Sequence, residues 1–503
     1  MRKTLFIKNA LILTASSLIL RFAGIIFKVW LAQKIGSEGI GLYQLVFSVY
    51  VLASTFAISG TSTAVTRLVT EELALENVKG ALKILRRAIQ ISLIIAFFSI
   101  AVLFFGADYI GNTVLGDSRT VLAVKILPLS LPFIGITSCV RGYFVARRKV
   151  TPNAVTQIFE QAIRIVIIIG LVGAFYKRGL AACCFAVILG DAIAETLSCA
   201  LLYLIYIFDK KKLKAKGSNN KNVPIIKRIL HISVPITLGR YLNTALRTAE
   251  NILVPKNLAK YPLASSSALS QFGMIKGMAL PVLFFPSAIL NAVSTLLIPE
   301  ISEAVALKRT AIVKNACERI FKITSIVGTL CGAIFFTAGR EITSLIYKEN
   351  DVGILITLLS PIVPLMYLDS ICDGILKGLD QQSFTFRTAI SDSVIRLVLI
   401  LLLLPKMGLR GFIIIMYFSN LLTCFLNVGR LIKISGAKID FLKTVIIPVL
   451  SALTCSLSLK LLLYKIGVES NLLFSVIFCV LTVFLYAVIL YSLKIVKKED
   501  FLR

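Results

Sequence analysis

The 503-residue sequence is poor in the side chains that most often build metal and enzyme centres. It has a single histidine, His231, and its ten cysteines contain no CxxC pair. A recognisable zinc or iron–sulfur site is therefore excluded, and cysteines within apolar stretches are typical of small residues that pack between helices. No GxSxG, P-loop or HExxH motif is present. We therefore expect no enzyme activity, no cofactor and no firm metal site.

Acidic residues are also scarce, because 25 Asp and Glu stand against 55 Lys and Arg, for a net charge of +30. Such a surplus is also found in proteins that bind nucleic acids. Here, however, the basic residues cluster in alternate connections between apolar stretches, which is the positive-inside pattern of membrane proteins. We therefore expect no nucleic-acid partner, and we expect both termini to lie in the cytoplasm.

Long hydrophobic stretches are what the sequence has in abundance. Hydrophobic residues make up 57% of the chain, and the mean hydropathy is +0.89. Stretches of about 20 apolar residues recur from end to end, and each is long enough to span hydrocarbon roughly 30 Å thick. We predict an all-α integral membrane protein with about 14 transmembrane helices. The predicted spans are 9–33, 41–70, 85–106, 121–146, 153–175, 180–207, 229–254, 266–299, 316–338, 353–377, 384–405, 409–432, 443–464 and 471–495.

A repeated pair of basic residues lies inside these apolar stretches. Arg21 and Lys28 are seven residues apart, and Arg240 and Arg247 repeat that spacing 219 positions later. Seven residues are two helical turns, so each pair shares a helix face. Charge at the bilayer centre costs at least about 2.5–3.5 kcal/mol per residue and normally faces a polar cavity or an ion partner. We hypothesise that these cations bind an anionic headgroup; the alternatives are buried ion pairs for the two deeper arginines and outward snorkelling for the other two.

A second repeat combines an acid with a base. Glu160 and Arg164 are four residues apart, and Asp392 and Arg396 repeat the pair 232 positions later. An intrahelical ion pair is the least costly way to hold both charges in a membrane, so we favour a structural role. The alternative is that a carboxylate of such a pair binds a coupling ion.

Further charges in apolar stretches are candidates for the same site. Asp191 and Glu195 form another i, i+4 pair, in which burial and like charge favour a proton on one of the two acids. Arg67 is expected to snorkel rather than to bind substrate. Glu250 stands three residues after a repeated arginine and can pair with it. Lys276 is equally consistent with a place in the substrate cavity and with a position that has no part in it.

The repeats predict two similar halves. An even number of six helices per half gives both halves the same orientation, so the repeats are parallel and related by an axis along the membrane normal. The expected division is an N-terminal lobe over 1–208, a cytoplasmic linker over 209–228, a C-terminal lobe over 229–434 and two additional helices within 435–503.

Three motifs carry a family resemblance: Ser17–Gly24 (SLILRFAG), Ile35–Gly39 (IGSEG) and Phe285–Pro299. They resemble the multidrug/oligosaccharidyl-lipid/polysaccharide (MOP) exporter superfamily. The similarity is greatest to the branch of sporulation proteins, polysaccharide biosynthesis proteins and lipid II flippases. The resemblance covers essentially the whole chain. It implies a V-shaped, MATE-like pair of six-helix lobes around a central cavity, which work by alternating access.

The resemblance also implies a function. It implies a flippase for an undecaprenyl-linked saccharide or peptidoglycan precursor, in a bacterial cytoplasmic membrane, for cell-wall or spore-cortex synthesis. The implied partners are the lipid-linked anionic saccharide, membrane lipid and cell-wall synthases, and Asp392 with Thr388 becomes a candidate Na⁺ site. The lipid II flippases carry an Asp-Arg pair in their eighth helix, whereas Gln271–Pro281 here has Lys276 as its one charge. A cation-coupled multidrug antiporter and a non-transporting scaffold for cell-wall synthesis stay open as alternatives.

Overall fold

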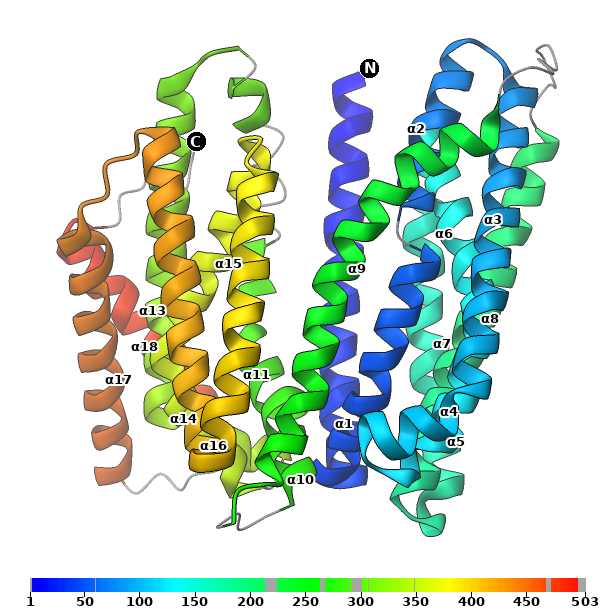
Figure 1. Cartoon of the computed structure of the whole chain (residues 1–503). Helices are drawn as coiled ribbons and strands as arrows, with labels where there is room; N and C mark the ends of the chain where they lie inside the picture. The colour runs from blue at the N-terminus through cyan, green and yellow to red at the C-terminus, as the bar shows by residue number, and fades with distance from the viewer. Residues whose placement is uncertain are drawn as a thin grey trace. The chain divides into compact units, whose positions relative to one another are not determined.

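The computed structural model describes residues 2–58, 60–212, 224–262, 267–288, 290–291, 301–305, 307–347, 349–466 and 472–495. Within these ranges every regular element is helical, which confirms the predicted fold class (Figure 1). Most of the predicted linker 209–228 and of the motif Phe285–Pro299 lies outside the described residues.

The chain divides by its internal contacts into two compact units. The first unit contains Met1–Phe27 and Glu38–Lys256, and the second contains Lys28–Ser37 and Asn257–Arg503. The helices up to this division are α1 (Arg2–Ile58), α2 (Thr61–Ala74), α3 (Val78–Phe105), α4 (Ala107–Tyr109), α5 (Val121–Ile126), α6 (Leu131–Ala146), α7 (Thr151–Phe175), α8 (Leu180–Lys211) and α9 (Ile225–Leu258).

The helices that follow belong to the second unit. They are α10 (Ala268–Gly273), the π-helical η5 (Met274–Ala279), α11 (Leu280–Phe284), α13 (Thr310–Tyr347), α14 (Asn350–Leu359), α15 (Val363–Gly378), α16 (Gln382–Ser435), α17 (Ile447–Lys465) and α18 (Leu472–Ser492). Helix α13 packs against α14, α15 and α17 and so forms the centre of this unit.

The described residues contain ten stretches that are long and apolar enough to cross a membrane. Two of them, Ala15–Ala74 and Gln382–Ser435, are 60 and 54 residues long, far beyond the roughly 20 that one crossing needs. Each is broken by a glycine with positive φ, Gly36 in α1 and Gly408 in α16. Each therefore contains two crossings. The 34-residue α9 and the shorter apolar helices of Ala268–Phe284 lie at two further predicted spans, 229–254 and 266–299.

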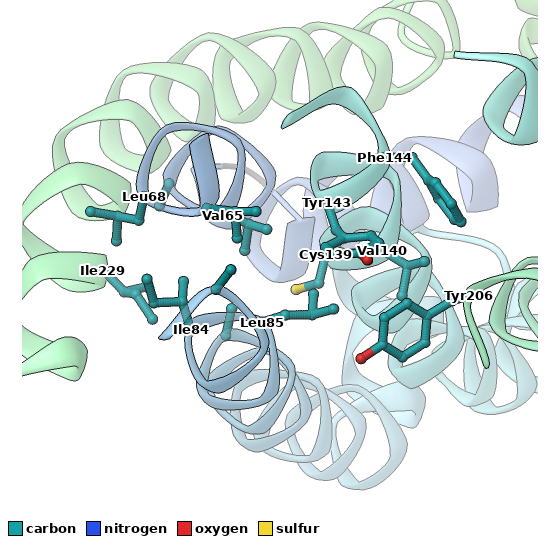
Figure 2. Close-up of a cluster of buried hydrophobic side chains, with 14 of the residues drawn as sticks. Val65, Leu68, Ile84, Leu85, Cys139, Val140, Tyr143, Phe144, Tyr206 and Ile229 are labelled. Carbon is teal, nitrogen blue, oxygen red and sulfur yellow. The ribbon is translucent and has the colours of Figure 1, made fainter. Parts of the chain in front are cut away.

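Hydrophobic packing joins α9 to the first unit (Figure 2). The core there combines side chains of five helices, α2, α3, α6, α8 and α9: Val65, Leu68, Ile84, Leu85, Cys139, Val140, Tyr143, Phe144, Tyr206 and Ile229. Figure 2 shows Ile229 of α9 beside Ile84 and Leu68. The contact-based division falls in the last turn of α9, whereas the division proposed from the sequence repeat falls before this helix. The six-plus-six division stays a prediction about the repeat.

The two additional C-terminal helices, α17 and α18, pack against α13. Ala333, Ala452 and Tyr486 contribute to one apolar cluster, and the Thr329 and Tyr486 hydroxyls are hydrogen-bonded at 3.0 Å. The Ser325 hydroxyl donates to the Thr444 carbonyl at 2.6 Å. These contacts make both helices part of the second unit.

Candidate functional site

A network of buried charges in the first unit is centred on Arg164 of α7. Its Nη2 lies 2.7 Å from Glu160 one turn away, so the predicted intrahelical pair is present. The same guanidinium also reaches α8, with Nε 2.9 Å from Asp191 and Nη2 3.5 Å from Glu195. Helices α7 and α8 pack closely, which brings these two predicted i, i+4 pairs into one cluster.

Glu160 is held from its other side by α6 and α8. Arg141 Nη2 of α6 lies 2.9 Å from Glu160 Oε2, and the Ser198 hydroxyl of α8 donates to the same oxygen at 3.2 Å. Sequence reasoning missed Arg141. The signal that was available is its place in the predicted span 121–146, where a charge needs a partner.

The charges in this network do not balance. The three carboxylates Glu160, Asp191 and Glu195 face the two guanidiniums of Arg141 and Arg164. Their side chains are between 12% and 27% exposed. With every group ionised the cluster carries one surplus negative charge, which is costly in a membrane. A bound proton or a monovalent cation would neutralise it.

The second unit holds the repeat of this arrangement in a different form. Arg396 Nε lies 3.1 Å from Asp392 Oδ2, and the Ser419 hydroxyl donates to Asp392 Oδ1 at 2.6 Å. The counterparts of Asp191 and Glu195 at the same offset of 232 are Thr423 and Asn427. The pair itself is therefore neutral, and uncharged residues stand where the first unit has Asp191 and Glu195.

Another acid of the second unit, Asp369 of α15, lies beside Asn427. The Asn427 amide donates to its Oδ1 at 2.8 Å. Thr388 is buried one turn before Asp392, where the family resemblance placed a Na⁺ ligand. Within the described ranges no group of three or more His, Cys, Asp or Glu is arranged to hold a metal ion.

The repeated basic residues have a different environment from the acids. Arg21, Lys28, Arg240 and Arg247 are all exposed. In the part of the chain that the structure describes, none of them forms an ion pair. Their charges are thus available to a ligand, and the alternative of buried ion pairs for Arg21 and Arg240 loses support.

Helix α9 presents its two arginines beside the face that packs on the second half of α1. On that face Thr55 and Thr244 are hydrogen-bonded at 3.4 Å, Asn251 donates to Ser48 at 3.0 Å, and the rings of Phe56 and Tyr241 lie 5.7 Å apart. Arg240 stands four residues before Thr244, and Arg247 stands three residues after it and four before Asn251. Both arginines therefore lie on the same side of α9 as these contacts.

The remaining residues predicted from the sequence are an arginine in an ion pair and two residues that are buried or half-buried. Arg67 Nε lies 3.1 Å from Glu71, and its side chain is 68% exposed, which supports a snorkelling role. Glu250 is 4% exposed, and the expected pair with Arg247 is not seen between these two described residues. Lys276 lies half-buried in η5.

Two further charge clusters escaped the sequence reasoning. Asp209, at the end of α8, is buried and contacts Arg147, Lys149 at 2.7 Å and the Tyr143 hydroxyl at 3.2 Å. Its two basic partners stand in a connection that the sequence assigned to the positive-inside pattern. The sequence alone could not indicate that these bases contact Asp209, because the acid lies about 60 residues further along the chain.

The second missed cluster lies before α5. Arg119 contacts Asp117 at 2.7 Å and Glu38 at 3.0 Å. Burial raises the pKa of Asp117, but the hydrogen bonds and charge of Arg119 outweigh it and hold this pKa below its ordinary value. The cluster fixes the connection that precedes α5 to the start of the second half of α1.

Curated relatives match nearly the whole chain. Stage V sporulation protein B of Bacillus subtilis (strain 168) is 26% identical over 441 residues, which cover 86% of this chain and 85% of the relative. Lipid II flippase MurJ of the same organism is 23% identical over 500 residues, covering 92% of this chain and 89% of the relative.

A solved structure repeats the fold. The inward closed conformation of a lipid II flippase MurJ matches with a TM-score of 0.71 at 14% identity, over 96% of this chain and 99% of that one. At this identity the likeness concerns the fold alone. The sequence model of the polysaccharide biosynthesis proteins matches residues 6–305, which is more than half of the chain. The charged helices described above are therefore those of a multi-pass membrane protein that belongs to the polysaccharide biosynthesis protein family.

Proposed function

We propose that the protein is a flippase that moves an undecaprenyl-linked saccharide or peptidoglycan precursor across the bacterial cytoplasmic membrane by alternating access. Its membership of the polysaccharide biosynthesis family and its similarity to a lipid II flippase support this proposal. The product would serve cell-wall or spore-cortex synthesis, and cell-wall synthases would take it over as partners.

The observation that carries the proposal is the set of exposed cations within apolar helices. Arg21, Arg240 and Arg247 of the first unit and Lys28 of the second are exposed, and none forms an ion pair among the described residues. A pyrophosphate offers many acceptor oxygens, and guanidinium groups bind such oxygens in a bidentate fashion. These cations therefore suit the headgroup of a lipid-linked saccharide better than a cationic drug. Lys276 remains a further candidate for this set.

The acidic network supplies a candidate for energy coupling. We expect a structural role for the neutral pair Asp392–Arg396, and for Glu160–Arg164 within its larger cluster. The surplus carboxylate beside Arg164 makes Asp191 or Glu195 a candidate to take up a proton or a cation. Na⁺ binding at Asp392 and Thr388 is the alternative, and transport in the presence and absence of a Na⁺ gradient separates the two.

The test is translocation of defined undecaprenyl-linked saccharides in proteoliposomes that contain the purified protein. We expect Arg21→Ala and Arg240→Ala to lower the rate at least tenfold without loss of expression. Lysine at either position should restore transport in part, because it keeps the charge and loses the bidentate fork. Arg67→Ala is the matched control, since that arginine already pairs with Glu71, and it should transport at close to the wild-type rate.

Two results would contradict the proposal. Full transport by both alanine variants would remove these arginines from the headgroup site. Export of amphipathic cations by the same proteoliposomes, with no movement of any lipid-linked saccharide, would replace the flippase with a multidrug antiporter.

A further inference from the structure

A basic pocket lies in the first unit where the first turns of α3 and α9 meet. Its volume is about 740 Å³, within the roughly 300–1,000 Å³ that is usual for small-ligand sites. Cationic or hydrogen-bonding side chains line one part of the pocket: Lys83, Arg87, Lys227 and His231. Apolar side chains, which include Ile226 and Leu230, line the rest. No acidic residue lines it among the described residues.

Two acids of α2 are paired with an arginine at the start of α9. Arg228, which precedes the core residue Ile229, turns to α2, with Nη2 2.7 Å from Glu71 and Nη1 3.6 Å from Glu72. The neighbouring Lys227 instead faces the pocket, together with Lys83 of α3. None of the four polar lining residues has an ion-pair partner within the described ranges. The pocket therefore concentrates positive charge that a ligand can neutralise.

Apolar stripes run from the pocket along both helices. On α3, Ile94 and Phe98 lie seven and eleven residues beyond Arg87 on the same side of the helix, and they are 70% and 64% exposed. The stripe on α9 continues from Leu230 to Val234 and Leu238, which are 40%, 46% and 63% exposed. Figure 2 shows Ile229 of α9 beside Ile84 of α3, and both belong to the buried apolar cluster that joins these helices.

We propose that this pocket binds the phosphate headgroup of an anionic glycerophospholipid, whose acyl chains lie along the apolar stripes of α3 and α9. The positive lining complements a negative headgroup, and basic pockets between membrane helices are a known mode of lipid recognition. The apolar part of the lining and the exposed stripes favour a lipid over a soluble anion. This inference stands independently of the transported substrate, since it uses none of the cations assigned to the transport site.

Native mass spectrometry of the purified full chain with phosphatidylglycerol tests this inference. Each basic residue near a membrane surface contributes about fivefold to the affinity for anionic lipid, so Lys83→Gln/Arg87→Gln should bind phosphatidylglycerol roughly 25-fold more weakly than the wild type. Arg86→Gln is the matched control. It removes one positive charge from an exposed neighbour that does not line the pocket, and it should bind as the wild type does. Phosphatidylcholine should bind weakly to all three proteins.

Several outcomes would overturn the inference. Equal retention of phosphatidylglycerol by the double variant and the wild type would do so, as would an equal loss in Arg86→Gln. Displacement of phosphatidylglycerol by millimolar inorganic phosphate would assign the pocket to a soluble anion, and displacement by an equal amount of undecaprenyl phosphate would assign it to the polyprenyl-linked substrate. If the double variant does not fold, Lys227→Gln addresses the same pocket from α9, with an expected loss of about fivefold.

Discussion

Arg164 and Arg396 occupy repeated positions but compensate different amounts of negative charge. Arg164 lies within 3.5 Å of three carboxylates, those of Glu160, Asp191 and Glu195. Arg396 is paired with Asp392, whose other oxygen accepts from the Ser419 hydroxyl. Removal of one partner of a buried ion pair leaves an uncompensated charge in a medium of low dielectric constant. The two units should therefore respond differently to the same substitution.

We predict that Arg164→Gln destabilises the protein more than Arg396→Gln does. Loss of a partner from a buried pair costs about 3–5 kcal/mol in soluble proteins, and Arg396→Gln should fall in that range. Arg164→Gln should exceed it, because Arg141 alone then faces three carboxylates. Thermal unfolding in detergent at neutral pH measures the difference.

The double variants provide the control for this prediction. Asp392→Asn/Arg396→Gln removes both charges of a neutral pair and should be more stable than either single variant. Glu160→Gln/Arg164→Gln should show no such recovery, because Asp191 and Glu195 still lose their guanidinium. Equal recovery in both units would show that the first-unit cluster behaves as a simple pair.

At the level of elements, glycines decide where two long helices break. The predicted spans 384–405 and 409–432 leave a gap at Gly408, and α16 departs from helical geometry there, with φ 54° and ψ −133°. Pro405 precedes the break and removes a backbone donor. The sequence located this break because glycine and proline act through the backbone, whatever surrounds them.

Gly408→Ala should destabilise the second unit. A Cβ at this position would lie 2.6 Å from Tyr261 Cδ1, and the positive φ is unfavourable for any residue with a side chain. We expect a loss of more than about 1 kcal/mol in the free energy of unfolding. The matched control is Gly429→Ala in the same helix, where an added Cβ meets nothing within 4 Å and φ is not positive. The prediction fails if both variants melt at the same temperature.

At the level of the whole molecule, the asymmetry of basic residues sets the orientation in the membrane. We predict cytoplasmic termini and a cytoplasmic linker over 209–228. The native cysteines are buried or half-buried, so a single introduced thiol should report on its own position. A cysteine at Ser218 should react with a membrane-impermeant maleimide only after the cells are opened.

An outer position provides the comparison for this labelling. Ser118 is exposed in the connection before α5, and Ser118→Cys should react in intact cells. Labelling of Ser218→Cys in intact cells, at the rate of Ser118→Cys, would reverse the predicted topology.

The class of protein, the approximate spans and the two repeated charge pairs could all be predicted from the amino-acid sequence. These follow from local properties: the length of an apolar stretch fits the bilayer, and residues four apart meet on one helix face. The packing of the helices was needed to show that Arg164 of α7 also binds Asp191 and that Arg141 of α6 binds Glu160. It also placed Lys83 and Lys227 around one pocket. Contacts between helices depend on how each helix is rotated and which neighbour it packs against, and many side chains across the interface set these together.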